Sequence, residues 1–134
     1  MYILDTNVLS ALRRTERRPK LVRWLRQQPE DSLFLSVVTL GEIERGIMLQ
    51  RTKNPAFASD LEAWLDRTSS LFADRILAFG AAEARMWGRL SARLGNTSAD
   101  LLIAATAIVA GATVVTENAS DFLPTGVPVE NPFR

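Results

Sequence analysis

Four acidic residues stand at boundaries between the secondary-structure elements that the sequence predicts. They are Asp5, Glu42, Asp100 and Asp121. The 134-residue sequence contains no histidine and no cysteine, which excludes thiolate zinc sites, cysteine nucleophiles and the usual general base. Sites built only from oxygen ligands select hard cations such as Mg²⁺ or Mn²⁺. These residues therefore favour attack by a metal-activated water, most economically on a phosphodiester.

Each of these acids also has a structural interpretation. Asp5 can cap the helix that follows it, and taken alone this explains the residue as well as catalysis does. Glu42 completes a capping box with Thr39, and Asp121 can stabilise a turn. Asp100 favours the positive dipole end of the helix that it begins. The catalytic hypothesis rests on the position of all four where a doubly wound sheet would bring chain ends together, since close carboxylates repel unless protons or a cation relieve them.

Apolar residues along the chain predict strands that alternate with helices. Strands are expected at residues 1–4, 33–38, 75–79, 113–116 and 127–129. Helices are expected just after residue 5 and over residues 21–25, 39–53, 57–72, 81–94 and 99–110. This order predicts an α/β sandwich with a mostly parallel central sheet, in which ligands bind at the carboxyl ends of the strands.

Hydroxyl and amide side chains near the same strand ends are expected to support the site, with a purely structural role as the alternative. They are Thr6, Asn7, Ser36, Thr39 and Thr116. Other acids alternate with apolar positions on a helix and are interpreted as solvated surface. Among them are Asp60, Glu62 and Asp66.

The length of the chain fits one domain, residues 1–134, with a single continuous core. Hydrophobic residues make up 47% of it, yet no stretch approaches the roughly 20 uncharged apolar residues that a membrane-spanning helix needs. An acid at position 5 leaves no basic-then-apolar leader at the N-terminus. We therefore expect a cytoplasmic protein that does not bind a membrane.

Basic residues are concentrated near the N-terminus, although the net charge is only +1. Seven of the 16 lie between positions 13 and 26, opposed there only by Glu16. They are Arg13, Arg14, Arg17, Arg18, Lys20, Arg23 and Arg26. The first four are candidates for contact with RNA phosphates or with an acidic protein partner. A solvated loop and helix face is an equally weighted alternative.

Three motifs in a fixed order resemble the PIN-domain family. They are Leu4-Asp5-Thr6-Asn7-Val8, the segment 36–46 around Glu42, and the segment 100–107 that begins with Asp100. The segment 115–122 and the terminal Asn131-Pro132-Phe133 fit the same family. The resemblance runs from Met1 to Phe133 and is closest to VapC-type toxins of bacterial toxin–antitoxin systems, including the FitB-like branch.

This resemblance implies a three-layer PIN sandwich with strand order 3-2-1-4-5. It implies a Mg²⁺- or Mn²⁺-dependent endoribonuclease that acts on tRNA or rRNA, with Asp5, Glu42 and Asp100 as the core metal-binding acids. It further implies a homodimer that is inhibited by a VapB-type antitoxin, whose C-terminal segment fills the site. Through that antitoxin the complex would bind operator DNA.

The sequence departs from the family pattern near the fourth acidic position. In this family that acid falls at the position of Asn118 or at that of Asp121, so both remain candidates for catalysis and metal binding. Glu117 stands where a basic residue is common, and here its carboxylate would perturb substrate binding or offer another ligand. Thr97 replaces a frequent proline, which we interpret as a minor change.

Two other functions are compatible with parts of this sequence. A non-catalytic PIN-like module that acts with an antitoxin on operator DNA is the main alternative, but it would not need to retain Asp5, Glu42 and Asp100. A phosphatase resembling the haloacid dehalogenases would use Asp5 as a nucleophile. Those enzymes need a second aspartate two residues later, where this chain has Asn7.

Overall fold

The computed structural model describes residues 1–133 of the protein. A five-stranded parallel sheet forms its centre. Its strands are β1 (Tyr2–Leu4), β2 (Leu33–Ser36), β3 (Ile76–Leu77), β4 (Thr113–Val115) and β5 (Val129–Glu130). They pair in parallel in the order β3-β2-β1-β4-β5, which confirms the expected topology. Strand β1 therefore lies in the middle, between β2 and β4.

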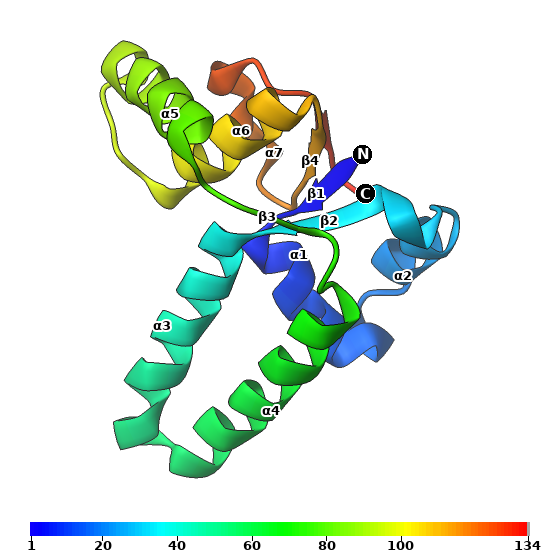
Figure 1. The fold of residues 1–134 in the computed structure, drawn as a ribbon. Coiled ribbons are helices and arrows are strands. Elements are labelled where there is room, and N and C mark those ends of the chain that lie inside the picture. The colour runs from blue at the N-terminus through cyan, green and yellow to red at the C-terminus, as the bar shows by residue number, and fades with distance from the viewer. Residues whose placement is uncertain (134) are drawn as a thin grey trace.

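Helices cover both faces of this sheet (Figure 1). One face carries α1 (Thr6–Ala11), the 3₁₀ segment η1 (Leu12–Arg17), α2 (Pro19–Arg26), α3 (Val37–Lys53) and α4 (Pro55–Leu71). The other carries α5 (Ala81–Leu94), α6 (Ala99–Ala110) and α7 (Ala119–Phe122). The short 3₁₀ turns η2 (Glu30–Ser32) and η3 (Leu123–Thr125) complete the fold. The predicted three-layer sandwich is confirmed.

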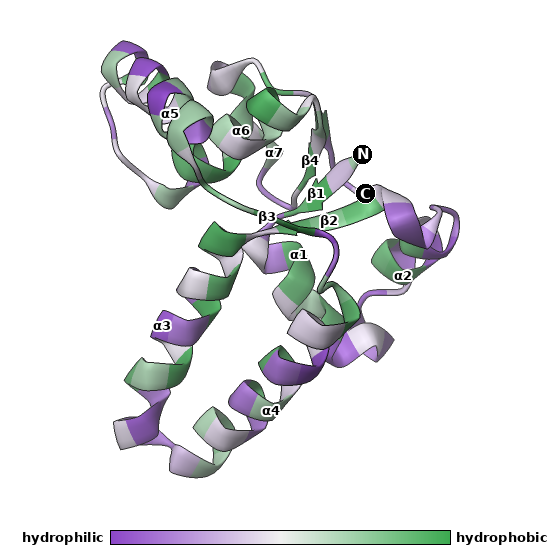
Figure 2. Ribbon diagram, viewed as in Figure 1, coloured by the Kyte–Doolittle hydropathy of each residue, from purple (hydrophilic) through white to green (hydrophobic). Residues whose placement is uncertain are grey.

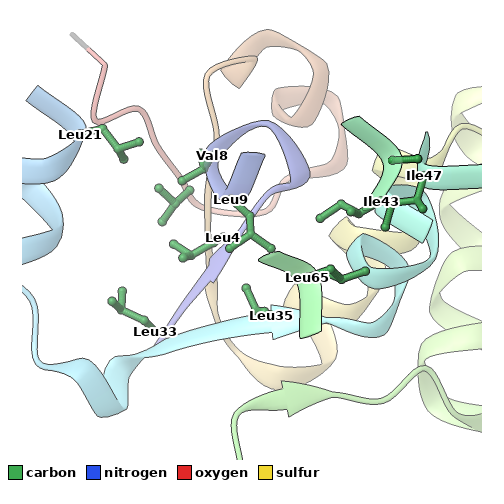
Figure 3. Packing of buried hydrophobic residues seen from close by; sticks show 11 residues of the cluster. Leu4, Val8, Leu9, Leu21, Leu33, Leu35, Ile43, Ile47 and Leu65 are labelled. Atoms are coloured by element: carbon green, nitrogen blue, oxygen red, sulfur yellow. The ribbon is translucent and has the colours of Figure 1, made fainter. Parts of the chain in front are cut away.

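Neighbouring residues of the central strands pack into different cores, because side chains alternate between the two faces of a strand. In β1, Leu4 joins the α1–α4 core and Ile3 joins the α5–α7 core. In β4, Val115 and Val114 divide in the same way. Figure 3 shows Leu4 within the first of these clusters, and Figure 2 shows the central strands coloured as hydrophobic. The sheet is therefore buried on both faces and gives β1 a rigid position.

Helices α3 and α4 form a hairpin that extends beyond the sheet in Figure 1. Ile47 on α3 and Ala58 on α4 are fully buried in the same core cluster. Arg51 and Glu62 form an ion pair between the two helices. Within residues 1–133, no helix is long and apolar enough to cross a membrane.

Several boundaries differ by a few residues from the sequence-based expectation, and two of these differences have a clear physical reason. Strand β2 ends at Ser36, because the Ser36 hydroxyl accepts a hydrogen bond from the Val38 N–H (3.1 Å) and so caps α3. The predicted capping box of Thr39 and Glu42 is therefore wrong, since both residues lie inside the helix. Strand β5 begins at Val129, two residues later than expected, after a turn that contains Gly126 in the left-handed region (φ 81°).

Candidate active site

Asp5 directly follows β1 and is the N-cap residue of α1, with only 4% of its surface exposed. Its Oδ1 accepts a hydrogen bond from the Thr6 N–H (2.8 Å). Its Oδ2 accepts one from the Thr116 hydroxyl (2.8 Å) and one from the Asn7 side-chain amide (3.3 Å). Capping uses one carboxylate oxygen, and the other is oriented by residues from two strand ends. The capping and site interpretations of Asp5 are therefore compatible.

Burial raises the pKa of the Asp5 carboxyl from 3.8 to about 6. The hydrogen bonds from Thr116 and Thr6 oppose this shift, because they stabilise the charged form. The negative charges of Asp100 and Glu42 raise the pKa further. Desolvation thus outweighs the hydrogen bonds, and the protein holds this carboxylate in surroundings that disfavour its charge.

Glu42 reaches the same region from the second turn of α3, and its side chain is exposed. Its Oε1 accepts a hydrogen bond from the Thr6 hydroxyl (2.7 Å). The hydroxyl oxygens of Thr6 and Thr39 lie 3.1 Å apart, and because Thr6 carries one hydroxyl proton, Thr39 must donate to Thr6. Thr6 therefore links two acids, through its backbone to Asp5 and through its side chain to Glu42.

Asp100 lies in the first turn of α6 and is half-buried. Burial raises the pKa of its carboxyl, and the charges of Asp121 and then Glu42 raise it further. The structure therefore brings Asp5, Glu42, Asp100 and Asp121 into one electrostatic group, as expected for side chains that meet at a sheet edge. Asp121 itself is exposed, on the short helix α7.

Asn118 and Asp121 occupy different positions relative to these acids. The backbone N–H of Asn118 donates to the Thr116 hydroxyl (3.0 Å), and its side chain is exposed. Within residues 1–133, no hydrogen bond joins the Asn118 side chain to an acid of the group. Asp121, in contrast, acts electrostatically on Asp100. Of the two candidates for the fourth position, Asp121 is therefore the one that is coupled electrostatically to another acid of the group.

A chain of polar contacts connects the C-terminal segment to Asp5. The side-chain amide of Asn131 donates to the Glu117 carbonyl (3.3 Å), and the Glu117 N–H donates to the Asn7 Oδ1 (3.3 Å). Asn7 in turn donates to Asp5. The sequence predicted a supporting role for Asn7 but none for Asn131, whose only signal was its place in the terminal Asn-Pro-Phe motif.

The family comparison bears on this arrangement of acids. The profile of the PIN domain matches residues 2–123, most of the chain. The chain belongs to the PIN-domain family. This membership confirms the resemblance inferred from the three motifs, all of which lie within the matched residues.

Similar proteins match this PIN domain along its whole length. The VapC ribonuclease Y4jK of Sinorhizobium fredii is 31% identical, with 100% of this chain and 99% of that protein covered. Toxin FitB of Neisseria gonorrhoeae is also 31% identical, with the same coverage. The structure of FitAB bound to the IR36 DNA fragment superposes with a TM-score of 0.85, at 31% identity, and covers 100% of this chain and 96% of that one.

The acids of this PIN domain are near one another without forming a closed cage. Within residues 1–133, no three carboxylates converge closely enough to form a ready-made metal cluster. The donor set itself consists of carboxylate, amide and hydroxyl oxygens, which are the ligands that hard divalent cations prefer. Burial is the main cause of the raised pKa values of Asp5 and Asp100, and the negative charges of the neighbouring acids raise them further.

Proposed function

We propose that this PIN-domain protein is a metal-dependent endoribonuclease that acts as the toxin of a toxin–antitoxin pair. The observation that carries the proposal is the buried Asp5 carboxylate, which is fixed by Thr6, Asn7 and Thr116 and faces further acids. Two relatives with full-length matches, named a VapC ribonuclease and a toxin, support the same function.

Asp5, Glu42 and Asp100 would hold Mg²⁺ or Mn²⁺, with Asp121 rather than Asn118 as the fourth group. A divalent cation bound there supplies a Lewis acid and lowers the pKa of a water molecule that attacks the phosphodiester. Positive charge would also relieve the mutual repulsion that keeps these carboxylates from converging.

The residues around Asp5 would keep the site in one geometry during the reaction. Thr116 and Asn7 hold the Asp5 Oδ2, and the Thr6 N–H holds Oδ1, so rotation of the carboxylate would break at least one of these bonds. The Thr6 hydroxyl, which itself contacts the Thr39 hydroxyl, holds the exposed Glu42 side chain by a hydrogen bond. These neutral donors position the acids without neutralising them, which leaves their charge available to a cation.

The proposal also covers partners. A VapB-type antitoxin would inhibit the enzyme, and the pair would bind operator DNA through the antitoxin, as the structure of FitAB on a DNA fragment suggests for a relative. RNA, with tRNA or rRNA as the expected class, is the substrate, and the protein would be a homodimer. A non-catalytic module that only binds antitoxin and DNA is less well supported, because it does not explain a buried carboxylate held among other acids.

The variant Asp5→Asn tests the proposal directly. We expect RNA cleavage to fall by at least about 100-fold and Mn²⁺ affinity, measured by calorimetry, to fall with it. The control is Asp60→Asn, which removes an exposed acid of α4 and should leave both measurements unchanged. If Asp5→Asn cleaved RNA and bound Mn²⁺ like the wild type, the enzyme proposal would be wrong.

A further inference from the structure

A groove of about 370 Å³ lies next to the acids, between α1, η1 and the loop after β4. Its lining includes Asn7, Arg14, Arg17 and Glu117. We propose that this groove binds a backbone phosphate of the RNA strand beside the phosphodiester that is cleaved, with Arg14 and Arg17 as the phosphate-binding residues. The proposal rests on the proposed ribonuclease function and adds to it the site that holds the substrate.

The groove is continuous with the candidate active site through shared residues. Asn7 lines the groove and also donates a hydrogen bond to the Asp5 carboxylate. Glu117 lines the groove as well, and its backbone N–H donates to Asn7. A strand whose reacting phosphodiester lies at Asp5 therefore continues past Asn7 into the groove.

RNA can bind next to the acidic group only if positive charge is present in the groove. RNA is a polyanion, and a group of four carboxylates repels it unless cations of the protein or the solution outweigh the repulsion. Arg14 and Arg17 are exposed, and within residues 1–133 neither forms an ion pair with an acid. Their charges are therefore available to a ligand, and a guanidinium can bind a phosphate through two parallel hydrogen bonds.

Two neighbouring arginines have a different task, because they hold η1 in place. The Arg13 guanidinium lies over the rings of Phe57 (5.1 Å) and Trp64 (5.8 Å), both on α4. The Arg18 guanidinium lies over the ring of Phe133 (5.4 Å). Such cation–π contacts fix η1 at both ends. The sequence placed four arginines in one class, whereas the structure divides them into two that stack on aromatic rings and two that form no ion pair within residues 1–133.

The position of the groove favours RNA over a flexible acidic protein as the occupant. The backbone that carries Arg14 and Arg17 is held at both ends and therefore loses little conformational entropy on binding. The groove opens directly beside the acids that would act on a phosphodiester. Glu117 contributes one negative charge to the lining, so the guanidinium charges of the groove outnumber it and the net field is attractive to phosphate.

The double variant Arg14→Gln/Arg17→Gln tests the proposal in the full-length protein. With a fluorescent single-stranded RNA of mixed sequence, we expect the KM for cleavage to rise about tenfold while kcat at saturating RNA stays within about twofold. The slope of log affinity against log salt should become shallower by about 1.4, because two phosphate contacts are lost. Mn²⁺ affinity should not change, since neither arginine belongs to the acid group.

The matched control is Arg85→Gln/Arg89→Gln, which removes the same charge from exposed positions on α5, across the sheet from η1. An unchanged KM and salt slope in the groove variant, or equal changes in the control, would overturn the proposal. Loss of binding to polyglutamate with RNA binding intact would also overturn it and would assign the groove to an acidic protein segment. If the wild type cleaved no RNA, the ribonuclease proposal itself would fail.

Discussion

Among residues 1–133, Asp5 and Arg75 are the charged residues that the fold buries most deeply, with 4% and 9% of their surfaces exposed, and their surroundings are opposite in kind. Arg75 donates to the carbonyls of Glu30 (2.6 Å), Leu33 (2.8 Å) and Leu71 (3.0 Å). Its guanidinium also lies 4.6 Å from the centroid of the Phe72 ring. The buried cation is thus surrounded by acceptors and by a π face.

Asp5 has hydrogen-bond donors but forms no ion pair with any basic residue that the structure describes. Its three donors are neutral, and the nearest charges that act on it, those of Asp100 and Glu42, are negative. A buried charge with complete local partners stabilises one conformation of the chain, whereas a buried charge facing like charges is a strained group that a ligand can relieve. Arg75 is therefore expected to stabilise the fold, and Asp5 to serve the proposed metal site.

The variant Arg75→Met should give the largest change in stability. Three backbone carbonyls would lose their donor, and we expect the free energy of unfolding to fall by about 3 to 5 kcal/mol. Urea unfolding measures this loss, and Arg67→Met on α4, where the arginine is exposed, is the control. Mn²⁺ affinity of the folded fraction should remain that of the wild type. A stable Arg75→Met protein with weakened metal binding would contradict the division between the two buried charges.

The pH dependence of the free energy of unfolding tests whether burial of Asp5 destabilises the folded protein. The folded state keeps a proton on Asp5 up to about pH 6, whereas an unfolded chain releases it near pH 3.8. In the metal-free protein, stability should therefore fall as pH rises from about 4 to 6, by about 3 kcal/mol at most from this group. Asp5→Asn should remove that part of the slope. Parallel pH profiles for the two proteins in chelator would show that Asp5 is not strained.

Substitutions at the two candidates for the fourth acidic position should lower RNA cleavage by less than Asp5→Asn does. Because the charge of Asp121 acts on Asp100, Asp121→Asn should lower RNA cleavage by about 10- to 100-fold. Asn118→Ala should lower it by less than about tenfold, since only the backbone of Asn118 contacts the supporting hydroxyl of Thr116. Cleavage rates at saturating RNA and Mn²⁺ would rank the two. The reverse order would move the fourth position to Asn118.

The fold and the acids were predictable because they depend on local sequence patterns. Alternating apolar strands and helices gave the parallel sheet, and a parallel sheet places the residues after its strands at one edge. Asp5 and Thr116 follow β1 and β4 directly, and their proximity followed once the strand order implied by the family resemblance placed these two strands side by side. The capping box at Thr39 was wrong because the β-branched Val37 and Val38 resembled a continuing strand and hid the cap at Ser36.

Contacts between segments distant in sequence were not predictable in this way. Arg75 was assigned to a strand, and nothing in its neighbourhood revealed that its guanidinium would reach three carbonyls. The stacking of Arg13 on α4 likewise depends on how helices pack and not on any periodicity. Asn131 belongs to the same class, because its partner Glu117 lies 14 residues away, with α7, η3 and β5 between them.

Asn131 is therefore the residue whose role depends most on the structure, and its predicted effect is the smallest. Removal of its amide in Asn131→Ala frees the Glu117 carbonyl and loosens Asn7, which holds Asp5. As a positioning residue three contacts from the carboxylate, it should lower kcat by about two- to tenfold with little change in KM. Asn131→Gln, which keeps an amide on a longer side chain, should recover part of the loss. A change in KM alone would instead indicate that Asn131 contributes to RNA binding in the groove and does not position Asp5.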